Sequence, residues 1–369
     1  MQATFIPGSE VNSDLGIVNA ARVSLGKKSQ LIHDHEIGED GKITLCRVPC
    51  TNPIHWSLSQ ADTKLIHYLA QHNHWTPFAH ARLYFEICWK SLVDQLHFYK
   101  HLLPGGFAWL EYDNADYIKG SLYSWINNLS ALPSASAIET VQDSIYKHYP
   151  VAHAALYKGT HEFPSFSYAS GLLEISEDVL ISRQVWDLAC ATLLVRVPIF
   201  VARQVRTSQV GIAYSDLYVE GESFSYNEVS RRYVSDEPEF YEIQQWRVRE
   251  GTRVKQGSTG IASDIVATNA RRNEAMNKDL CCITYEGMLS DTIAPEQARA
   301  VLPQSMYTEF YMTGTLHRWA QWLSLRLESH VQEETRYIAS RVLDELKTHF
   351  PEWSMQYFTK EWTESYLLP

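Results

Sequence analysis

The hydrophobic and polar positions of residues 60–89 predict a helix followed by a strand. Apolar residues recur at the three- and four-residue spacing of one helix face, at Leu65, Ile66, Leu69 and Ala70. We therefore expect a helix over residues 60–73. Thr76-Pro77 ends it, because a residue before proline avoids the helical conformation. Residues 81–89 are rich in aromatic and branched side chains, which predicts a strand.

The C-terminal part of the chain has a helical pattern over residues 261–289. Its charged face consists of Arg271, Arg272, Glu274 and Lys278. The segment from Asp291 interrupts this pattern, and Pro295 is placed to open another helix, as proline does in a first turn.

A third helical pattern runs from Trp319 to about Leu346 and predicts one long helix that ends before Pro351. On that helix Trp322, Arg326 and His330 would share a face, at i, i+4 and i+8. Arg326 then either covers apolar surface with its aliphatic stem or holds a ligand.

Composition and charge exclude some classes of protein. Of the 369 residues 45% are hydrophobic, which is enough for a sizeable core, and the net charge of −11 argues against general nucleic-acid binding. The chain has neither an apolar run of about 18 residues nor a signal-like start, so we expect a cytoplasmic protein with no membrane partner.

Six cysteines raise the question of a metal site. Cys46 and Cys50 have the spacing of half a zinc site, but no second pair of ligands lies at a matching distance. Reduced thiols and no bound metal are therefore expected.

The polar run from Ser225 to Tyr233 carries the strongest candidate chemistry. In an extended backbone Glu228, Ser230 and Arg232 would line one side together. A carboxylate, a hydroxyl and a guanidinium suit a small anionic ligand, because arginine binds phosphate with a fork of donors. Arg203-Gln204-Val205-Arg206 lies just upstream and adds two guanidiniums and an amide. The alternative is a surface strand with a salt bridge between Glu228 and Arg232.

Ordered motifs along the chain resemble those of the flavin-dependent thymidylate synthase family. The two central motifs are Pro198-Ile199-Phe200-Val201-Ala202-Arg203-Gln204 and Asn227-Glu228-Val229-Ser230-Arg231-Arg232-Tyr233. The others are Ala20-Ala21-Arg22-Val23-Ser24, His74-Trp75-Thr76-Pro77-Phe78-Ala79-His80, Arg299-Ala300-Val301-Leu302-Pro303 and Leu323-Ser324-Leu325-Arg326. They reach from about residue 20 to about residue 340, with unmatched stretches between them.

The resemblance implies an α+β core, a mixed or antiparallel sheet packed with helices, in a chain that forms homotetramers. In compact members, a strand like residues 81–89 runs almost directly into the Pro198 segment. Here residues 90–194 intervene, which we interpret as an inserted, mostly helical subdomain. We expect the core to consist of residues 1–89 and 195–369, with the nucleotide and flavin sites in the second part.

The inserted segment contains an echo of a later one. Gly120-Ser121-Leu122 and Trp125 recur in register as Gly314-Thr315-Leu316 and Trp319, the second copy lying where the family binds flavin. The first copy is a structural mimic, a second nucleotide-contacting element, or a coincidence.

The family's reaction methylates C5 of dUMP to give dTMP. Methylenetetrahydrofolate is the carbon-donating co-substrate, and FAD recharged by NADPH supplies electrons. The cysteine-dependent alternative needs a nucleophile in a Pro-Cys-His-Gln context, whereas the chain has Pro49-Cys50-Thr51-Asn52.

The resemblance also assigns residues. Arg326 is the expected catalytic residue, placed against the uracil. The expected dUMP-binding residues are Gln204, Arg206, Glu228, Ser230, Arg231, Arg232, Arg299 and Arg326. The expected FAD-binding residues are Thr76, Thr207, Ser208, Gln209, Glu228, Thr315, His317 and Gln321. Ser24 and His80 belong to the flavin and folate side.

The flavin motif departs from the family pattern. Thr207-Ser208-Gln209 stands where Arg-His-Arg is usual, and residues 212–224 are an added loop. Either substitute groups hold the flavin, or flavin use has been lost or changed. The candidate substitutes are Arg206, Arg318 and the basic loop of Arg247, Arg249, Arg253 and Lys255. The rival functions are C5 modification of another pyrimidine nucleotide and nucleotide binding without catalysis.

Overall fold

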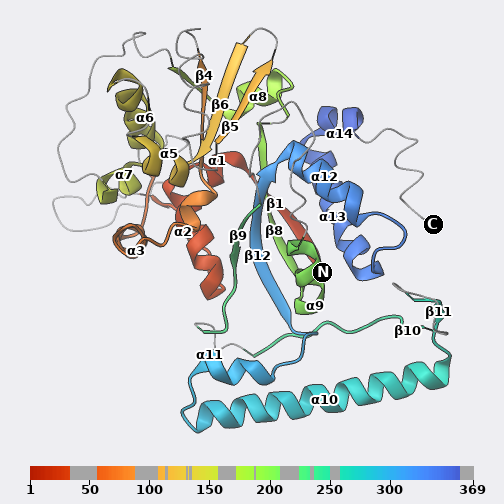
Figure 1. Ribbon diagram of the computed structural model, residues 1–369. Helices are drawn as coiled ribbons and strands as arrows, with labels where there is room; N and C mark the ends of the chain where they lie inside the picture. The colour runs from red at the N-terminus through yellow and green to blue at the C-terminus, as the bar shows by residue number, and fades with distance from the viewer. Residues whose placement is uncertain are drawn as a thin grey trace.

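The computed structural model describes residues 1–33, 56–87, 107–112, 115–129, 132, 135–156, 172–186, 188–207, 224–232, 237–249 and 258–357. The described residues form two four-stranded antiparallel sheets with packed helices (Figure 1), so the predicted α+β class is confirmed. None of the described helices is long and apolar enough to cross a membrane.

The core sheet has the strand order β1-β8-β12-β9. Its strands are β1 (Gln2–Ile6), β8 (Cys190–Pro198), β12 (Tyr307–Thr315) and β9 (Ser225–Glu228). Leu193, Val195, Val197, Phe310 and Met312 are buried on the two central strands, β8 and β12. These positions alternate along each strand, so one face of the sheet packs against helices.

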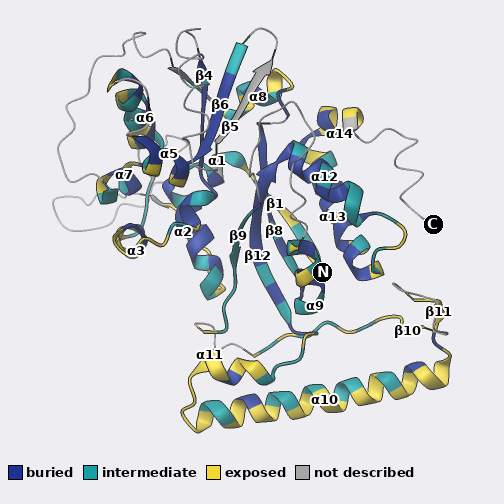
Figure 2. Cartoon of the chain, in the orientation of Figure 1, coloured by how far each residue is buried: buried dark blue, intermediate teal, exposed yellow. Residues whose placement is uncertain are grey.

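Three helices cover that face. They are α9 (Ile199–Arg206), α12 (Leu316–Arg326) and α13 (Glu333–His349), and α14 (Pro351–Tyr357) follows. Buried tryptophans from α12 and α14 fill the space between them, at Trp319, Trp322 and Trp353. Figure 2 shows this buried layer in dark blue.

The predicted single helix from Trp319 to Leu346 is wrong, because residues 327–332 separate α12 from α13. Leu327 is buried at the end of α12, and two acidic residues, Glu333 and Glu334, occupy the first turn of α13. Acidic residues favour a helix N-terminus, so this pair was the sequence signal of a new helix. His330 lies in the connection and does not share a helix face with Arg326.

The second sheet has the order β5-β6-β4-β7. Its strands are β4 (Arg82–Ile87), β5 (Phe107–Tyr112), β6 (Ala115–Ser121) and β7 (Leu172–Ile175). The associated helices are α5 (Leu122–Asn128), α6 (Ala135–His148), α7 (Pro150–Leu156) and α8 (Glu177–Ser182). The N-terminal helices α1 (Gly8–Val11), α2 (Asp14–Arg22) and α3 (Gln60–Gln71), with the turns η1 (Val23–Leu25) and η3 (Pro77–Ala79), precede β4.

The inserted segment, residues 90–194, therefore contains strands as well as the predicted helices. β5, β6 and β7 lie within it, and β8 begins inside it at Cys190. Its strands β6 and β7 pair with β4, which precedes the segment, so the insertion shares a sheet with the N-terminal part of the chain.

An arm extends from the core sheet between β9 and β12. It consists of the pair β10 (Arg247–Val248) and β11 (Gly260–Ile261), the helices α10 (Asp264–Ser290) and α11 (Pro295–Ala298), and the turn η6 (Arg299–Val301). The predicted helix at residues 261–289 and the helix opening at Pro295 are confirmed. The remaining pair is β2 (Ile32–His33) with β3 (Trp56–Ser57).

Candidate active site

Helix α9 begins directly after β8 and fixes the first site residues. Val201, Ala202 and Val205 are buried against the core, and the indole Nε1 of Trp322 donates a hydrogen bond to the Val205 carbonyl oxygen at 3.0 Å. The opposite face of α9 therefore stays accessible, and it carries Arg206 at the end of the helix.

Three arginines from two helices surround Tyr226 of β9: Arg206 of α9, and Arg318 and Arg326 of α12. We call them the guanidinium cluster. The Cζ atom of Arg206 lies 5.2 Å from the centroid of the Tyr226 ring. Burial raises the pKa of Tyr226 to about 12, and the positive charges of the three arginines act in the opposite direction. The cluster thus creates a local positive field on an acidic protein.

Arg326 is the member of the cluster that calls most clearly for a ligand. It is half-buried, and burial lowers the pKa of its guanidinium although Tyr226 opposes the shift. Its Nε atom is buried and has no hydrogen-bond partner among the described residues. A buried donor on a cation is costly when it is unpaired, so an acceptor from a bound molecule would stabilise it.

Glu228 supplies the negative charge at the edge of the cluster. One of its carboxylate oxygens accepts a hydrogen bond from Arg206, and the other accepts one from the Thr308 hydroxyl at 2.7 Å. The salt bridge of Glu228 is therefore with Arg206 and not with Arg232. Thr308 and Tyr226 were not predicted, although Tyr226 stands two residues before Glu228 on one face of a strand.

Ser230 and Arg232 lie beyond the end of β9, so the predicted extended row of three side chains stops at Glu228. The Ser230 hydroxyl accepts hydrogen bonds from the backbone N–H and the Nε of Arg232, each at 3.4 Å. The backbone N–H of Ser230 donates to the Ser24 carbonyl oxygen at 2.9 Å. This bond brings the Ala20–Ser24 motif to the candidate site.

Gln204 lies on the same helix as Arg206 but its amide is held by the start of α13. Its Nε2 donates to Gln332, and its Oε1 accepts from the Thr335 hydroxyl at 3.1 Å. These bonds fix the orientation of the amide beside the site.

Arg299 is not part of the guanidinium cluster within one chain. It is exposed on η6, at the end of the arm, and its Nε donates to the Glu296 carbonyl oxygen at 3.3 Å. Arg231 is half-buried in the turn that also contains Arg232.

The segment His74–His80 splits into exposed and buried parts. Thr76 is exposed at the start of η3, whereas His80 is buried, and its Nδ1 lies 2.7 Å from the Thr313 hydroxyl on β12. Burial, assisted by Arg82, lowers the pKa of His80 to about 3, so its imidazole is neutral near pH 7. His80 thus connects this segment to the core sheet.

The predicted flavin residues fall into three groups. Thr315 is buried, and its hydroxyl caps α12 by accepting from the Arg318 backbone N–H at 3.1 Å. The Gln321 side chain lies 2.9 Å from His317 Nε2 and accepts from Arg318 at 3.2 Å. Thr207 is exposed at the end of α9, while Ser208 and Gln209 lie outside the described residues.

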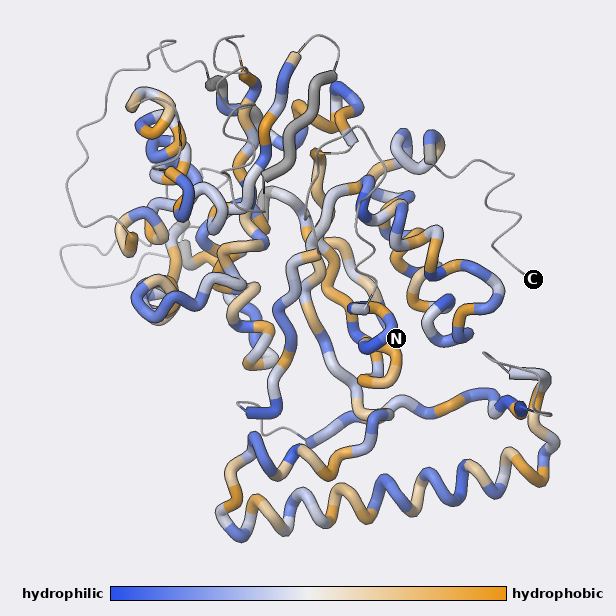
Figure 3. Tube along the Cα trace, in the orientation of Figure 1, coloured by the Kyte–Doolittle hydropathy of each residue, from blue (hydrophilic) through white to orange (hydrophobic). Residues whose placement is uncertain are grey.

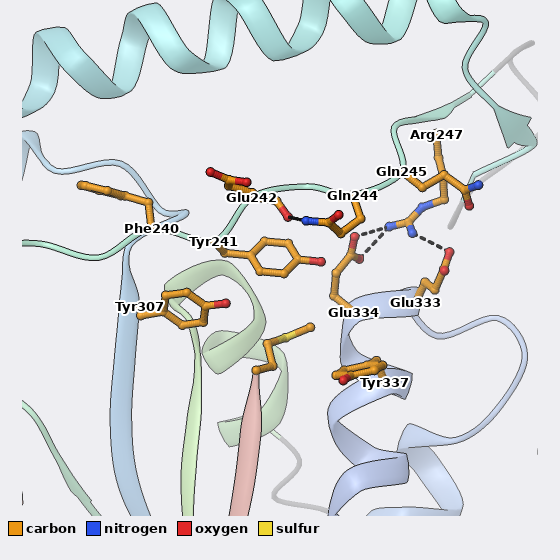
Figure 4. Close-up of a pocket in the computed structure, with 11 residues that line it drawn as sticks. Phe240, Tyr241, Glu242, Gln244, Gln245, Arg247, Tyr307, Glu333, Glu334 and Tyr337 are labelled. Atoms are coloured by element: carbon orange, nitrogen blue, oxygen red, sulfur yellow. Dashed lines mark hydrogen bonds and ion pairs between the residues drawn. The ribbon is translucent and has the colours of Figure 1, made fainter.

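A separate cavity of about 540 Å³ lies at the base of α13 (Figure 4). Its lining is aromatic and acidic: Met1, Phe240, Tyr241, Glu242, Gln244, Gln245, Arg247, Tyr307, Glu333, Glu334 and Tyr337. Arg247 pairs with Glu333 and Glu334, so this member of the basic loop is neutralised. Of the candidate residues from the sequence, the cavity contains only the substitute Arg247 among the described residues, and its carboxylates disfavour a phosphate. Arg253, Lys255, Cys46 and Cys50 lie outside the described residues.

Comparisons with known proteins agree with these motifs. The family model described as "Thymidylate synthase complementing protein" (Thy1) matches residues 182–352. A flavin-dependent thymidylate synthase of Thermosipho africanus is 30% identical over 169 residues, covering 46% of this chain and 68% of the relative. One from Aquifex aeolicus is 26% identical over 327 residues, covering 83% of this chain and 93% of the relative.

Two further matches are a curated relative covered over a smaller share of its length and a solved structure of lower identity. A flavin-dependent thymidylate synthase of Thermus thermophilus is 31% identical over 196 residues, and the match spans only 65% of that relative's length. The UMP/dUMP methylase PolB of Streptomyces cacaoi, solved with 5-Br UMP, is 20% identical with a TM-score of 0.40, covering 63% of this chain and 88% of that one. The family-model match at residues 182–352 includes both central motifs and the downstream arginines Arg299 and Arg326. The chain belongs to the flavin-dependent thymidylate synthase family.

Proposed function

We propose that the protein is a flavin-dependent thymidylate synthase that converts dUMP to dTMP. Methylenetetrahydrofolate would give the carbon and NADPH the two electrons that turn a methylene unit into a methyl group. The observation that carries the proposal is the half-buried Arg326 inside the guanidinium cluster, with a buried Nε that lacks a partner among the described residues.

Arg326 would act on the uracil ring. Its guanidinium, weakly solvated, would stabilise negative charge on the pyrimidine as C5 becomes nucleophilic. Tyr226 packs against the same cluster and Glu228 holds Arg206 in place, so the ring would meet charges that are already oriented. Ser230 and Arg232 would bind the phosphate, because the Arg232 guanidinium and nearby backbone N–H groups match its oxygens.

The residues present also fit a flavin. His317, Gln321 and Arg318 form a hydrogen-bonded set on the first turns of α12, next to the guanidinium cluster. They would hold the polar edge of the flavin or its phosphates where the family's arginine motif is altered. The flavin supplies the electrons of the reaction when it is bound.

Arg299 would complete the nucleotide site from a neighbouring chain. It is exposed on the arm and has no interaction with the guanidinium cluster of its own chain among the described residues. We propose the family's homotetramer, in which one copy's arm would reach another copy's cluster.

The test is an assay of the purified protein with dUMP, methylenetetrahydrofolate, NADPH and added FAD. We expect a yellow protein that forms dTMP, and an Arg326→Ala variant that keeps its flavin absorbance but makes no product. An Arg341→Ala variant changes an exposed arginine of α13 and serves as the control. A wild-type protein that takes up no FAD would contradict the proposal.

A further inference from the structure

The two four-stranded sheets have the same topology. Read in one direction their orders are β5-β6-β4-β7 and β9-β12-β8-β1, and all neighbours are antiparallel. Hence β4 corresponds to β8, β5 to β9, β6 to β12 and β7 to β1. The central pairs also start in equivalent register, with Arg82 opposite Ser121 in one sheet and Cys190 opposite Thr315 in the other.

Equivalent hydrogen bonds connect each sheet to the helix that follows it. Ser121 caps α5 by accepting from Ser124 N–H at 3.0 Å, as Thr315 caps α12. The backbone bonds Leu122 N–H to Ala81 O (2.9 Å) and Leu316 N–H to Ala189 O (2.8 Å) correspond. The indole hydrogen bonds also correspond: Trp125 Nε1 donates to Leu83 O at 3.3 Å, and Trp319 Nε1 donates to Ala191 O at 3.0 Å.

The correspondence continues through the next helices. α6 ends at His148, Tyr149 follows, and Pro150 begins α7. In the same way α13 ends at His349, Phe350 follows, and Pro351 begins α14. The Tyr149 N–H donates to Ile145 O, and the Phe350 N–H donates to Leu346 O, each at 2.8 Å.

Each of these helices also contacts the edge strand of its sheet at the equivalent position. The Ser144 hydroxyl of α6 donates to Glu174 of β7 at 2.9 Å, and Phe5 N–H of β1 donates to Glu345 of α13 at 3.1 Å. Glu174 pairs with Phe85 and Phe5 pairs with Leu193. Phe85 and Leu193 are equivalent positions of β4 and β8, so Glu174 and Phe5 are equivalent too.

The edge strands are exchanged between the two halves. β1 comes first in the chain but completes the sheet of β8, while β7 comes late and completes the sheet of β4. This is the arrangement of a strand-swapped dimer contained within one chain. In Figure 1, α5–α7 and α12–α14 accordingly lie on opposite sides of the molecule.

We infer that the segment containing β4, β5, β6, α5, α6 and β7 is a second copy of the core module that has lost its nucleotide site. The two copies form a pseudo-dimer within the chain, so one chain binds one nucleotide where two equivalent copies would bind two. The site count rests on the proposed function, whereas the duplication does not.

The second copy lacks two of the three guanidiniums of the candidate site. At the positions equivalent to Arg318 and Arg326, counted from the two N-caps, it has Ser124 and Leu132. Tyr123 and Asn127 take the places of His317 and Gln321. The arm with Arg299 is also absent, because only residues 113 and 114 separate β5 from β6. A phosphate or an anionic uracil would find no guanidinium there from these positions.

The site count is tested by titrating the full-length, FAD-loaded protein with dUMP in a calorimeter. We expect one nucleotide per chain. Asn127 and Gln321 lie at the same position of the equivalent helices α5 and α12. Asn127→Ala should change neither dUMP binding nor flavin content, whereas Gln321→Ala should lower flavin content. Two nucleotides per chain, or loss of flavin in Asn127→Ala, would overturn the inference that the second copy has lost its site.

The duplication is tested separately by a pair of tryptophan variants. Trp125→Phe and Trp319→Phe each remove one indole N–H bond to a strand carbonyl, so each should lower the Tm by a similar ~2–4 °C. An unchanged Tm in only one variant would refute the equivalence of the two junctions. Absence of dUMP binding in the wild type would refute the nucleotide site, and the tryptophan pair would still decide the duplication.

Discussion

Single side chains determine what the candidate site can bind. Arg326 is half-buried with an unpartnered Nε among the described residues, and Arg206 is held by Glu228. The Arg326 guanidinium needs an anion or the polar edge of a ligand more than a surface arginine does, because water does not fully solvate it. This difference separates the cluster from the many exposed arginines of the chain.

Arg232→Ala should weaken dUMP binding about 10- to 100-fold, because one charge-assisted hydrogen bond to the phosphate is lost. The Kd is measured by calorimetry, with deoxyuridine as the comparison ligand. Deoxyuridine has no phosphate, so its binding should be equal in the variant and the wild type. Arg341→Ala, at an exposed arginine of α13, is the control. An unchanged Kd for dUMP in Arg232→Ala would exclude the phosphate role.

His80 should make stability fall as the pH is lowered. Its folded pKa is about 3, while an unfolded histidine titrates near 6.5. The unfolded chain therefore binds the extra proton first, so the contribution of His80 is complete above pH 6.5 and is lost as pH falls toward 3.

Thermal unfolding from pH 7 to pH 4 tests this assignment. The wild-type Tm should fall more steeply than that of His80→Gln, whose amide has no proton to gain and still reaches Thr313. Asp14, with a folded pKa of about 6, acts in the opposite sense in both proteins and cancels in the comparison. Parallel curves would show that His80 gains its proton as readily in the folded protein as in the unfolded chain, which would contradict the lowered pKa.

At the level of elements, the junction of β12 and α12 positions the site, and its packing requires a glycine. A Cβ atom at Gly314 would lie 2.5 Å from Cε1 of Phe224. That ring packs edge-on against Trp319, at 4.6 Å between centroids, and Arg318 lies over it. The absence of a side chain at residue 314 therefore lets Phe224 support the guanidinium cluster.

Gly314→Ala should lower the free energy of unfolding by about 1–3 kcal/mol, because the ring must shift in a packed core. Gly260→Ala is the matched control, since its nearest neighbour would be Val248 Cγ2 at 4.0 Å. Denaturant unfolding measures both. The replacement of Phe224 by Leu in the Gly314→Ala protein should recover part of the loss, and equal stability of the two single variants would contradict the close contact.

The elements also show how far the sequence predicts this structure. Local patterns predicted α3, β4, α10 and the start of α11, since apolar spacing and proline act within a few residues. The break between α12 and α13 was missed because Leu327 continues the apolar pattern while the chain turns. The motifs predicted that Arg206 and Glu228 share a site, but their ion pair and the contacts of Tyr226 and Thr308 depend on long-range strand pairing.

The whole molecule combines a pseudo-dimer of two sheets with an arm that neither sheet needs for its own packing. α10 buries only Ala267 and Tyr285 among its 27 residues. Its opposite face exposes four apolar side chains: Ile265, Met276, Leu280 and Ile283. In Figure 3, hydrophobic positions recur in orange along α10. The four exposed residues lie in one stripe at helical spacing, which is typical of a face covered by another helix.

Assembly through this stripe would explain why Arg299 is carried on the arm and has no interaction with the guanidinium cluster of its own chain among the described residues. Leu280→Glu with Ile283→Glu should therefore reduce the mass measured by light scattering from that of a tetramer, because two buried carboxylates oppose association. Asn277→Glu places one carboxylate beside the stripe and should leave the mass unchanged. dUMP binding should fall together with the mass if a neighbouring arm completes the site. A dissociated protein that binds dUMP as tightly as the wild type would show that each chain builds its nucleotide site alone.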